Sequence, residues 1–142
     1  MKKIQLFFVF IGLVFSACSK DAVMEPAEGL EVKLVVASGW CGTEKTIVMN
    51  SKQTRRDLRG NTCNKSSVNT VKQTDQDRFN RLGRYLQELD LFDREYKECA
   101  RCRDGVDYIL TIDDGTRLIE QSIGFDNKEK GIQDFITFLT EL

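Results

Sequence analysis

An amphipathic segment in the middle of the chain constrains the fold more than any other feature. Between about Asp75 and Leu91, apolar residues recur at spacings of three and four, which predicts a helix with one apolar face. The stripe consists of Phe79, Leu82, Leu86 and Leu89, flanked by Tyr85 and Phe92. Thr74 or Asp75 is placed to cap the first turn. Gly83 costs up to about 1 kcal/mol relative to alanine, so we expect it to mark a close approach to the sheet.

Strand patterns lie on both sides of this helix. Residues 30 to 36 alternate between a more apolar and a less apolar face, as a strand of a half-buried sheet does. Asp113 to Thr116 is a hairpin signal, because Asp-Gly supplies the positive φ angles of a two-residue turn. The remaining strands are expected at residues 46–49, 54–59, 106–112 and 117–124. Residues 61–73 are polar and poor in apolar side chains, so we interpret them as a loop.

A second helix is expected at the end of the chain. Asp126 or Asn127 can cap it, and its apolar stripe runs from Ile132 to Leu139. The order βββ-α-ββ-α predicts an α+β domain over residues 30–142, in which two layers form from an antiparallel sheet and two helices packed on one of its faces. Residues 41–60 and 102–124 show a similar succession of cysteine, strand, turn and strand, so an internal pseudo-repeat is a further interpretation.

The N-terminus has the organisation of an export signal. Lys2 and Lys3 precede an apolar run from Ile4 to Phe15. As a helix this run would be roughly 18 Å long, too short for a hydrocarbon core of roughly 30 Å. An ordinary secretory signal, with a chance cysteine at position 18, is one interpretation of this segment.

The four residues Phe15-Ser-Ala-Cys18 resemble the lipobox of bacterial lipoproteins. The resemblance implies that residues 1–17 are removed, that Cys18 carries a diacylglycerol and usually an amide-linked acyl chain such as palmitate, and that residues 18–29 form a tether. Two or three acyl chains anchor a protein stably in a membrane. Ser19, a non-acidic residue after the cysteine, is similar to outer-membrane sorting signals. We therefore expect an outer membrane lipoprotein of the bacterial cell envelope, facing the periplasm or the cell surface.

Charge and composition limit the possible functions. Without residues 1–17 the chain has 19 basic and 22 acidic residues, a formal charge of −3, which argues against a nucleic-acid partner. It contains no histidine, the commonest general base and the commonest metal ligand. We therefore expect no catalytic residues, no metal and no cofactor.

Four further cysteines in an oxidising compartment predict two disulfides. Three pairings are possible, and we favour Cys41 with Cys63 and Cys99 with Cys102. If the first three strands form a meander, the segments carrying Cys41 and Cys63 leave the same end of the sheet. Cys99 and Cys102 also form a C-x-x-C pattern, for which a redox or zinc site is the alternative. A redox site would gain reactivity at a helix N-terminus, whereas here a strand follows.

Three groups of residues are candidates for recognition or chemistry. Trp40, in a glycine-containing loop, is suited either to stacking on a ligand or to covering a disulfide. A basic stretch can meet an anionic partner, although an edge strand also favours exposed charge; its arginines are Arg55, Arg56 and Arg59. Carboxylates near the hairpin can serve hydrolysis or calcium binding, although turn roles explain the first two; they are Asp113, Asp114, Asp126, Glu120 and Asp107.

The sequence thus favours a non-catalytic binding module, anchored in the membrane through lipid on Cys18, with an envelope protein or glycan as its partner. A small inhibitor of a hydrolase is one alternative. A hydrolase that depends on Asp113 and Asp114 is another.

Overall fold

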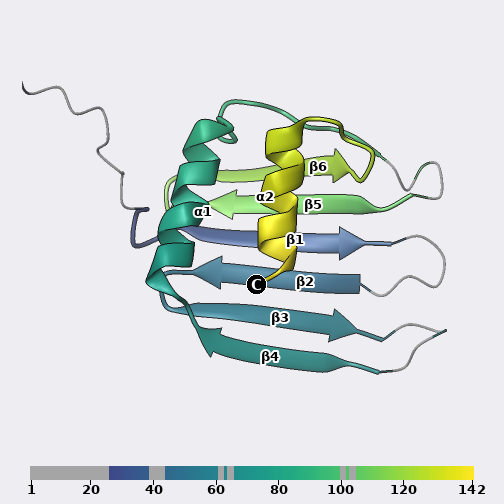
Figure 1. The fold of residues 1–142 in the computed structure, drawn as a ribbon, viewed down its shortest axis with the longest axis horizontal. Coiled ribbons are helices and arrows are strands. Elements are labelled where there is room, and N and C mark those ends of the chain that lie inside the picture. Colours follow the sequence, from purple (N-terminus) through teal and green to yellow (C-terminus); the bar gives the residue numbers. More distant parts are fainter. Residues whose placement is uncertain (1–25, 39–43, 61–62, 64–65, 100–101, 103–104) are drawn as a thin grey trace, which may run out of the picture.

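The computed structural model describes residues 26–38, 44–60, 63, 66–99, 102 and 105–142. Their secondary structure follows the order ββββ-α-ββ-α (Figure 1). The elements are β1 (Glu31–Ala37), β2 (Glu44–Asn50), β3 (Gln53–Arg59), β4 (Val68–Gln73), α1 (Gln76–Glu88), β5 (Asp107–Asp113), β6 (Leu118–Gly124) and α2 (Lys130–Thr140).

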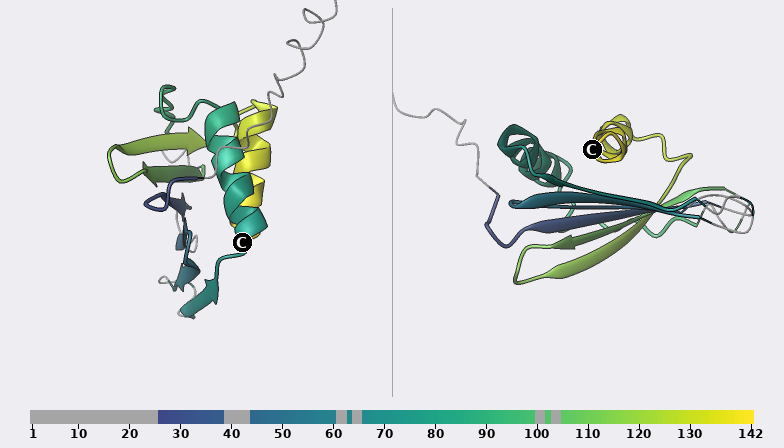
Figure 2. Two further views of the ribbon diagram at one scale, coloured as in Figure 1. Left: turned by 90° about the vertical axis from the view of Figure 1, so that its left-hand side faces the viewer. Right: turned by 90° about the horizontal axis from the view of Figure 1, so that it is seen from below.

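All six strands form one antiparallel sheet in the order β4-β3-β2-β1-β5-β6. Strands β1 to β4 follow one another as a meander. After α1 the chain returns to pair β5 with the free side of β1, which makes β1 a central strand. Figure 2 shows both helices on the same side of the sheet. The predicted α+β class and antiparallel sheet are confirmed.

The polar segment before the first helix was expected to be a loop, and this prediction is wrong. Residues Val68 to Gln73 form β4, which pairs with β3 along its length. In β4 only Thr70 is partly buried, and the other five residues are exposed. A strand with both faces in solvent has no apolar alternation, so the usual sequence signal of a strand is missing.

One buried cluster of apolar residues draws on the sheet and on both helices. Leu34 in β1 sits between Ile47 of β2 and Leu110 of β5, and all three are at most 1% exposed. The next row of the same face repeats this arrangement with Val32, Met49 and Ile112. The helices contribute Phe79, Leu82 and Leu86 from α1 and Ile132, Phe135, Ile136, Phe138 and Leu139 from α2.

Helix α1 begins as predicted. Asp75 is its N-cap, and its carboxylate accepts a hydrogen bond from the amide of Arg78 at 2.9 Å. Gly83, however, does not approach the sheet. A Cβ built on Gly83 would lie 2.6 Å from Cγ of Pro26, so the glycine makes room for the N-terminal segment.

Helix α2 and the hairpin before it differ in detail from the prediction. The N-cap of α2 is Glu129, which makes no side-chain capping hydrogen bond. Asn127 acts two residues earlier, because its side-chain oxygen accepts the Glu129 amide at 2.9 Å. In the β5–β6 turn only Gly115 has a positive φ, 83°, since the turn is centred one residue later than Asp-Gly.

Residues 89–98, here called the strap, join α1 to the outer edge of β6. The buried amide of Gln121 holds the strap through three hydrogen bonds. Its nitrogen donates to the carbonyls of Leu91 at 2.6 Å and Arg94 at 2.9 Å, and its oxygen accepts the amide of Tyr96 at 3.1 Å. Lys97 forms a parallel bridge with Ser122 of β6. The strap therefore covers the β6 edge of the sheet.

Candidate functional site

The connections of this domain divide between two ends of the sheet. The chain segments 38–43, 60–67 and 99–106 start or finish at one end, because Ala37, Arg59 and Asp107 lie there in the strand register. We call it the loop end. Residues 26–29 join β1 at the other end, the entry end, where the Ser51 hydroxyl donates to the Glu28 carbonyl at 3.4 Å. Figure 2 shows the two ends at opposite extremes of the sheet.

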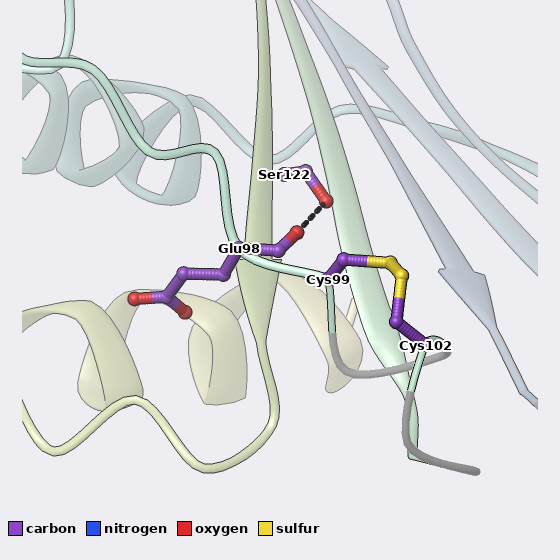
Figure 3. Close-up of a disulfide and its surroundings, with 4 residues drawn as sticks. All are labelled: Glu98, Cys99, Cys102 and Ser122. Atoms are coloured by element: carbon purple, nitrogen blue, oxygen red, sulfur yellow. Dashed lines mark hydrogen bonds between the residues drawn. A yellow bond between two sulfur atoms is a disulfide. The ribbon is translucent and has the colours of Figure 1, made fainter.

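The three described cysteines, Cys63, Cys99 and Cys102, belong to the loop end. Cys99 and Cys102 form a disulfide with their Cα atoms 5.4 Å apart, which is one of the two expected pairs (Figure 3). Cys63 is also disulfide-bonded. Cys41, the partner favoured for it, and the recognition candidate Trp40 lie outside the described residues, as does Cys18.

Glu98 fixes the segment that carries the disulfide. Its backbone amide donates to Ser122 O at 2.8 Å, and its carbonyl accepts from the Ser122 hydroxyl at 2.7 Å (Figure 3). Its carboxylate accepts the Gly124 amide at 2.6 Å and the Asn127 side-chain amide at 2.9 Å. The residue before Cys99 is thus tied both to β6 and to the connection that leads into α2.

A second cluster ties the strap to the start of α2. Arg94 makes a bidentate ion pair with Glu129 at 2.7 and 2.9 Å, and the Tyr96 hydroxyl donates to the same carboxylate at 3.0 Å. The hydrogen bond from Arg94 lowers the pKa of Glu129. Burial, followed by the hydrogen bond to Glu129, raises the pKa of Tyr96 to about 12. The three side chains thus bind one another across 33 to 35 positions of the chain, and the cluster braces the loop end.

Three open cavities surround the loop end. One, of about 270 Å³, lies between α2 and the ends of β5 and β6, with Phe125 at its rim. Another, of about 470 Å³, lies beside the disulfide between the strap and the β6–α2 connection. The third, of about 440 Å³, lies on the β3–β4 hairpin and includes Arg55 and Arg59. Hollows of this kind on braced loops suit the recognition of a partner.

Phe125 is a recognition candidate that the sequence analysis missed. It follows β6 directly, and 57% of its surface is exposed. The cavity behind it is lined by Tyr108, Ile123, Ile132 and Ile136, among others. An exposed aromatic side chain beside a hollow is a common anchor in protein interfaces. No local pattern in the sequence marks Phe125, because its exposure depends on how the β6–α2 connection is placed.

The three candidate arginines do not act as one basic face. Alternation along β3 places Arg55 and Arg59 on the face opposite the helices and Arg56 on the helix side. Arg55 pairs with Asp57 at 2.9 Å, and Arg59 lies 3.8 Å from Glu44. Arg56 is half-buried, and its Nε has no hydrogen-bond partner in the described part of the chain.

The candidate carboxylates are separated by the fold, and those at the hairpin build the turn. Asp114 accepts from the amides of Thr116 and Arg117 at 2.9 and 2.8 Å and from the Thr116 hydroxyl at 2.6 Å. These hydrogen bonds, that of the Thr116 hydroxyl above all, hold the pKa of Asp114 far below its usual value. Asp113 accepts the Gly115 amide at 2.8 Å. Both therefore have structural roles in the turn, at the entry end and far from the braced loops.

Within the described ranges, no three Cys, Asp or Glu side chains are grouped so that they could hold a metal ion. No helix in that part of the chain is long and apolar enough to cross a membrane. Comparison with protein-family models and with curated protein sequences finds no match to this chain.

Proposed function

We propose that the protein is a membrane-anchored lipoprotein of the bacterial envelope whose folded domain binds another envelope component without catalysis. The observation that carries this proposal is the opposition of the two ends of the domain. The chain enters from the N-terminal side at one end, and the braced loops lie at the other. An anchor at Cys18 would therefore direct the loop end away from the membrane, where a protein or glycan partner can reach it.

The loop end suits binding better than chemistry. Among the described residues, the charged groups that brace it are paired, as in the cluster of Arg94, Tyr96 and Glu129 and in the hydrogen bonds of Glu98. A catalytic acid or base needs a pKa matched to its task and access to substrate, and paired groups that brace loops have neither. Pre-formed hollows and an exposed aromatic residue are instead typical of a recognition surface.

We also infer that the sheet and the helices form a two-layer domain, since residues of the sheet, α1 and α2 share one buried cluster. The internal pseudo-repeat is supported by the order of elements, because the hairpins β2–β3 and β5–β6 each precede a helix. β4 has no counterpart in the second half of the chain.

Metabolic labelling with an alkynyl fatty acid tests the anchor. The full-length protein should be labelled and should sediment with membranes, whereas Cys18→Ala should lose the label. Equal labelling of both proteins would refute the lipid anchor, whatever the folded domain binds.

A matched pair of surface substitutions tests the binding role. Phe125→Ser removes an exposed apolar side chain at the loop end, and Leu118→Ser removes one that is 72% exposed in the β5–β6 hairpin, next to its tip. Capture of an envelope component by the purified domain should be lost with Phe125→Ser and kept with Leu118→Ser. Capture of a hydrolase, with loss of that enzyme's activity, would identify an inhibitor. A turnover activity lost in Asp113→Asn/Asp114→Asn, with folding intact, would refute the non-catalytic role.

A further inference from the structure

The two outer strands of the sheet differ in whether their outer edges are covered. The outer edge of β6 is covered by the strap, which bonds to it through Tyr96 and Glu98. Strand β4, at the other edge, pairs with β3 alone among the described residues (Figure 1). An uncovered edge presents a row of unused backbone hydrogen-bonding groups to other extended chains.

The pairing of β3 with β4 shows which backbone groups these are. The Thr74 amide donates to the carbonyl of Lys52, the residue directly opposite it in the extended register. Bonded and non-bonded pairs alternate along an antiparallel ladder, so even-numbered residues of β4 bond to β3. The amides and carbonyls of Asn69, Val71 and Gln73 therefore point away from the sheet.

Near the middle of this edge, an apolar side chain lies on one face of the sheet and basic side chains lie on the other. On the face opposite the helices, the middle residue of β4 is Val71, which is 54% exposed. On the helix-side face, the register aligns Lys72 with Thr54, and Arg56 with Thr70. Alternation places every acidic residue of β2, β3 and β4 on the opposite face.

The positive charge of the helix-side face has little internal compensation. Lys45 of β2 donates to the carbonyl of Thr140, at the end of α2, at 2.6 Å. Burial and the nearby charge of Arg56 lower the pKa of Lys45. Neither Arg56 nor Lys72 makes an ion pair with a carboxylate in the part of the chain that the structure describes. A chain docked on β4 would meet this charge along one of its own faces.

We propose that the outer edge of β4 is a docking site for an extended, acidic segment of a partner protein, which adds to the sheet as a further strand. Backbone bonds to Asn69, Val71 and Gln73 hold the segment. A carboxylate opposite Lys72 makes a cross-strand ion pair, and an apolar residue packs against Val71 on the other face. The partner segment thus alternates acidic and apolar residues. A second copy of this chain fits less well, because pairing β4 with itself would bring two sets of Lys72 and Arg56 together.

This edge begins beside the β3–β4 cavity of the loop end, which Asn69 helps to line, and runs through Val71 and Gln73 toward the entry end. It does not depend on the lipid anchor. The test uses the protein without residues 1–17 and two synthetic peptides, one alternating Glu and Val and the other alternating Lys and Val. The Glu peptide should shift the amide resonances of Asn69, Val71 and Gln73 and slow their hydrogen exchange. The Lys peptide should bind at least about fivefold more weakly, because it places like charges opposite each other. Added salt should reduce the difference.

Three substitutions sharpen the test. Lys72→Glu should weaken binding of the Glu peptide about fivefold or more, whereas Lys33→Glu, the same change on an exposed lysine of β1, should not. Val71→Pro removes an outward amide that the sheet does not use, and should weaken binding about tenfold. If Val71→Pro does not fold, the two lysine variants still decide the question.

Equal binding of both peptides, or equal effects of the two lysine variants, would overturn the proposal. So would amide shifts that leave the residues of β4 unaffected. Sedimentation of the peptide-free protein as a dimer that Lys72→Glu or Val71→Pro converts to a monomer would also overturn it, because a second copy would then occupy the edge.

Discussion

Replacing Gln121 with methionine should strongly destabilise the domain. Gln121 is 2% exposed and makes the three hydrogen bonds that hold the strap on β6. Methionine has a similar volume and cannot make them, so the variant isolates the polar contribution. The carbonyl of Leu91 and the amide of Tyr96 lose their partner in a buried setting, whereas the Arg94 carbonyl is partly open to water.

The size of the effect follows from these two buried groups. A buried polar group left without a partner costs about 1–3 kcal/mol, and the more apolar methionine recovers part of that loss. We expect the free energy of unfolding to fall by about 2–4 kcal/mol, out of a total of about 5–15 kcal/mol for a typical domain. With a urea m-value of about 1–3 kcal/mol/M, the unfolding midpoint should fall by about 1–2 M.

Urea unfolding followed by far-ultraviolet circular dichroism is the assay. Gln53→Met, the same substitution at an exposed position in β3, is the control and should change stability by less than about 0.5 kcal/mol. A loss below about 0.5 kcal/mol for Gln121→Met would refute the reasoning, because it would show that the strap is held by other contacts.

Further predictions concern charge and the disulfide. Because its pKa is lowered in the folded state, Asp114 stabilises the fold above about pH 4, and this contribution is lost as the pH falls. The stability difference between wild type and Asp114→Asn should therefore shrink in unfolding titrations below about pH 4. The pKa of Tyr96 is raised to about 12, so its contribution is present below about pH 10 and lost as the pH rises through 12. Tyrosinate absorbance should show a late step near pH 12 that Tyr96→Phe removes. The Cys99→Ser/Cys102→Ser variant opens a loop with a sequence separation of 3 and should lose about 2 kcal/mol or less in thermal unfolding; a much larger loss would mean that the disulfide also holds the packed structure.

The features that the sequence predicted correctly depend on residues close together in the chain. The apolar spacing of α1 and its cap at Asp75 depend on residues within a few positions of one another. The same holds for the hairpin at Gly115, where only glycine takes a positive φ without strain. Strands β1 and β5 were predictable because one of their faces is buried more fully than the other.

Features set by distant partners could not be predicted from the sequence. Strand β4 exists because β3 offers it a ladder of backbone bonds, and backbone bonding leaves no mark on side-chain pattern. Gly83 contacts Pro26, which is 57 positions earlier in the chain, and no local rule connects the two. The N-cap of α2 is Glu129, whose carboxylate is bound by Arg94 and Tyr96 of the strap, 35 and 33 positions earlier in the chain.

The class of the domain, its main helix and five of its strands were predictable without the structure, because hydrophobic periodicity and turn chemistry act over a few residues. Tertiary structure was needed to show which of the three candidate arginines makes no ion pair within the described residues, which sheet edge is open and which end carries the braced loops. Those properties depend on strand order and register, which bring residues far apart in the chain side by side. The lipid anchor at Cys18 stays a prediction from the sequence, and the acidic partner of β4 is a proposal from the fold.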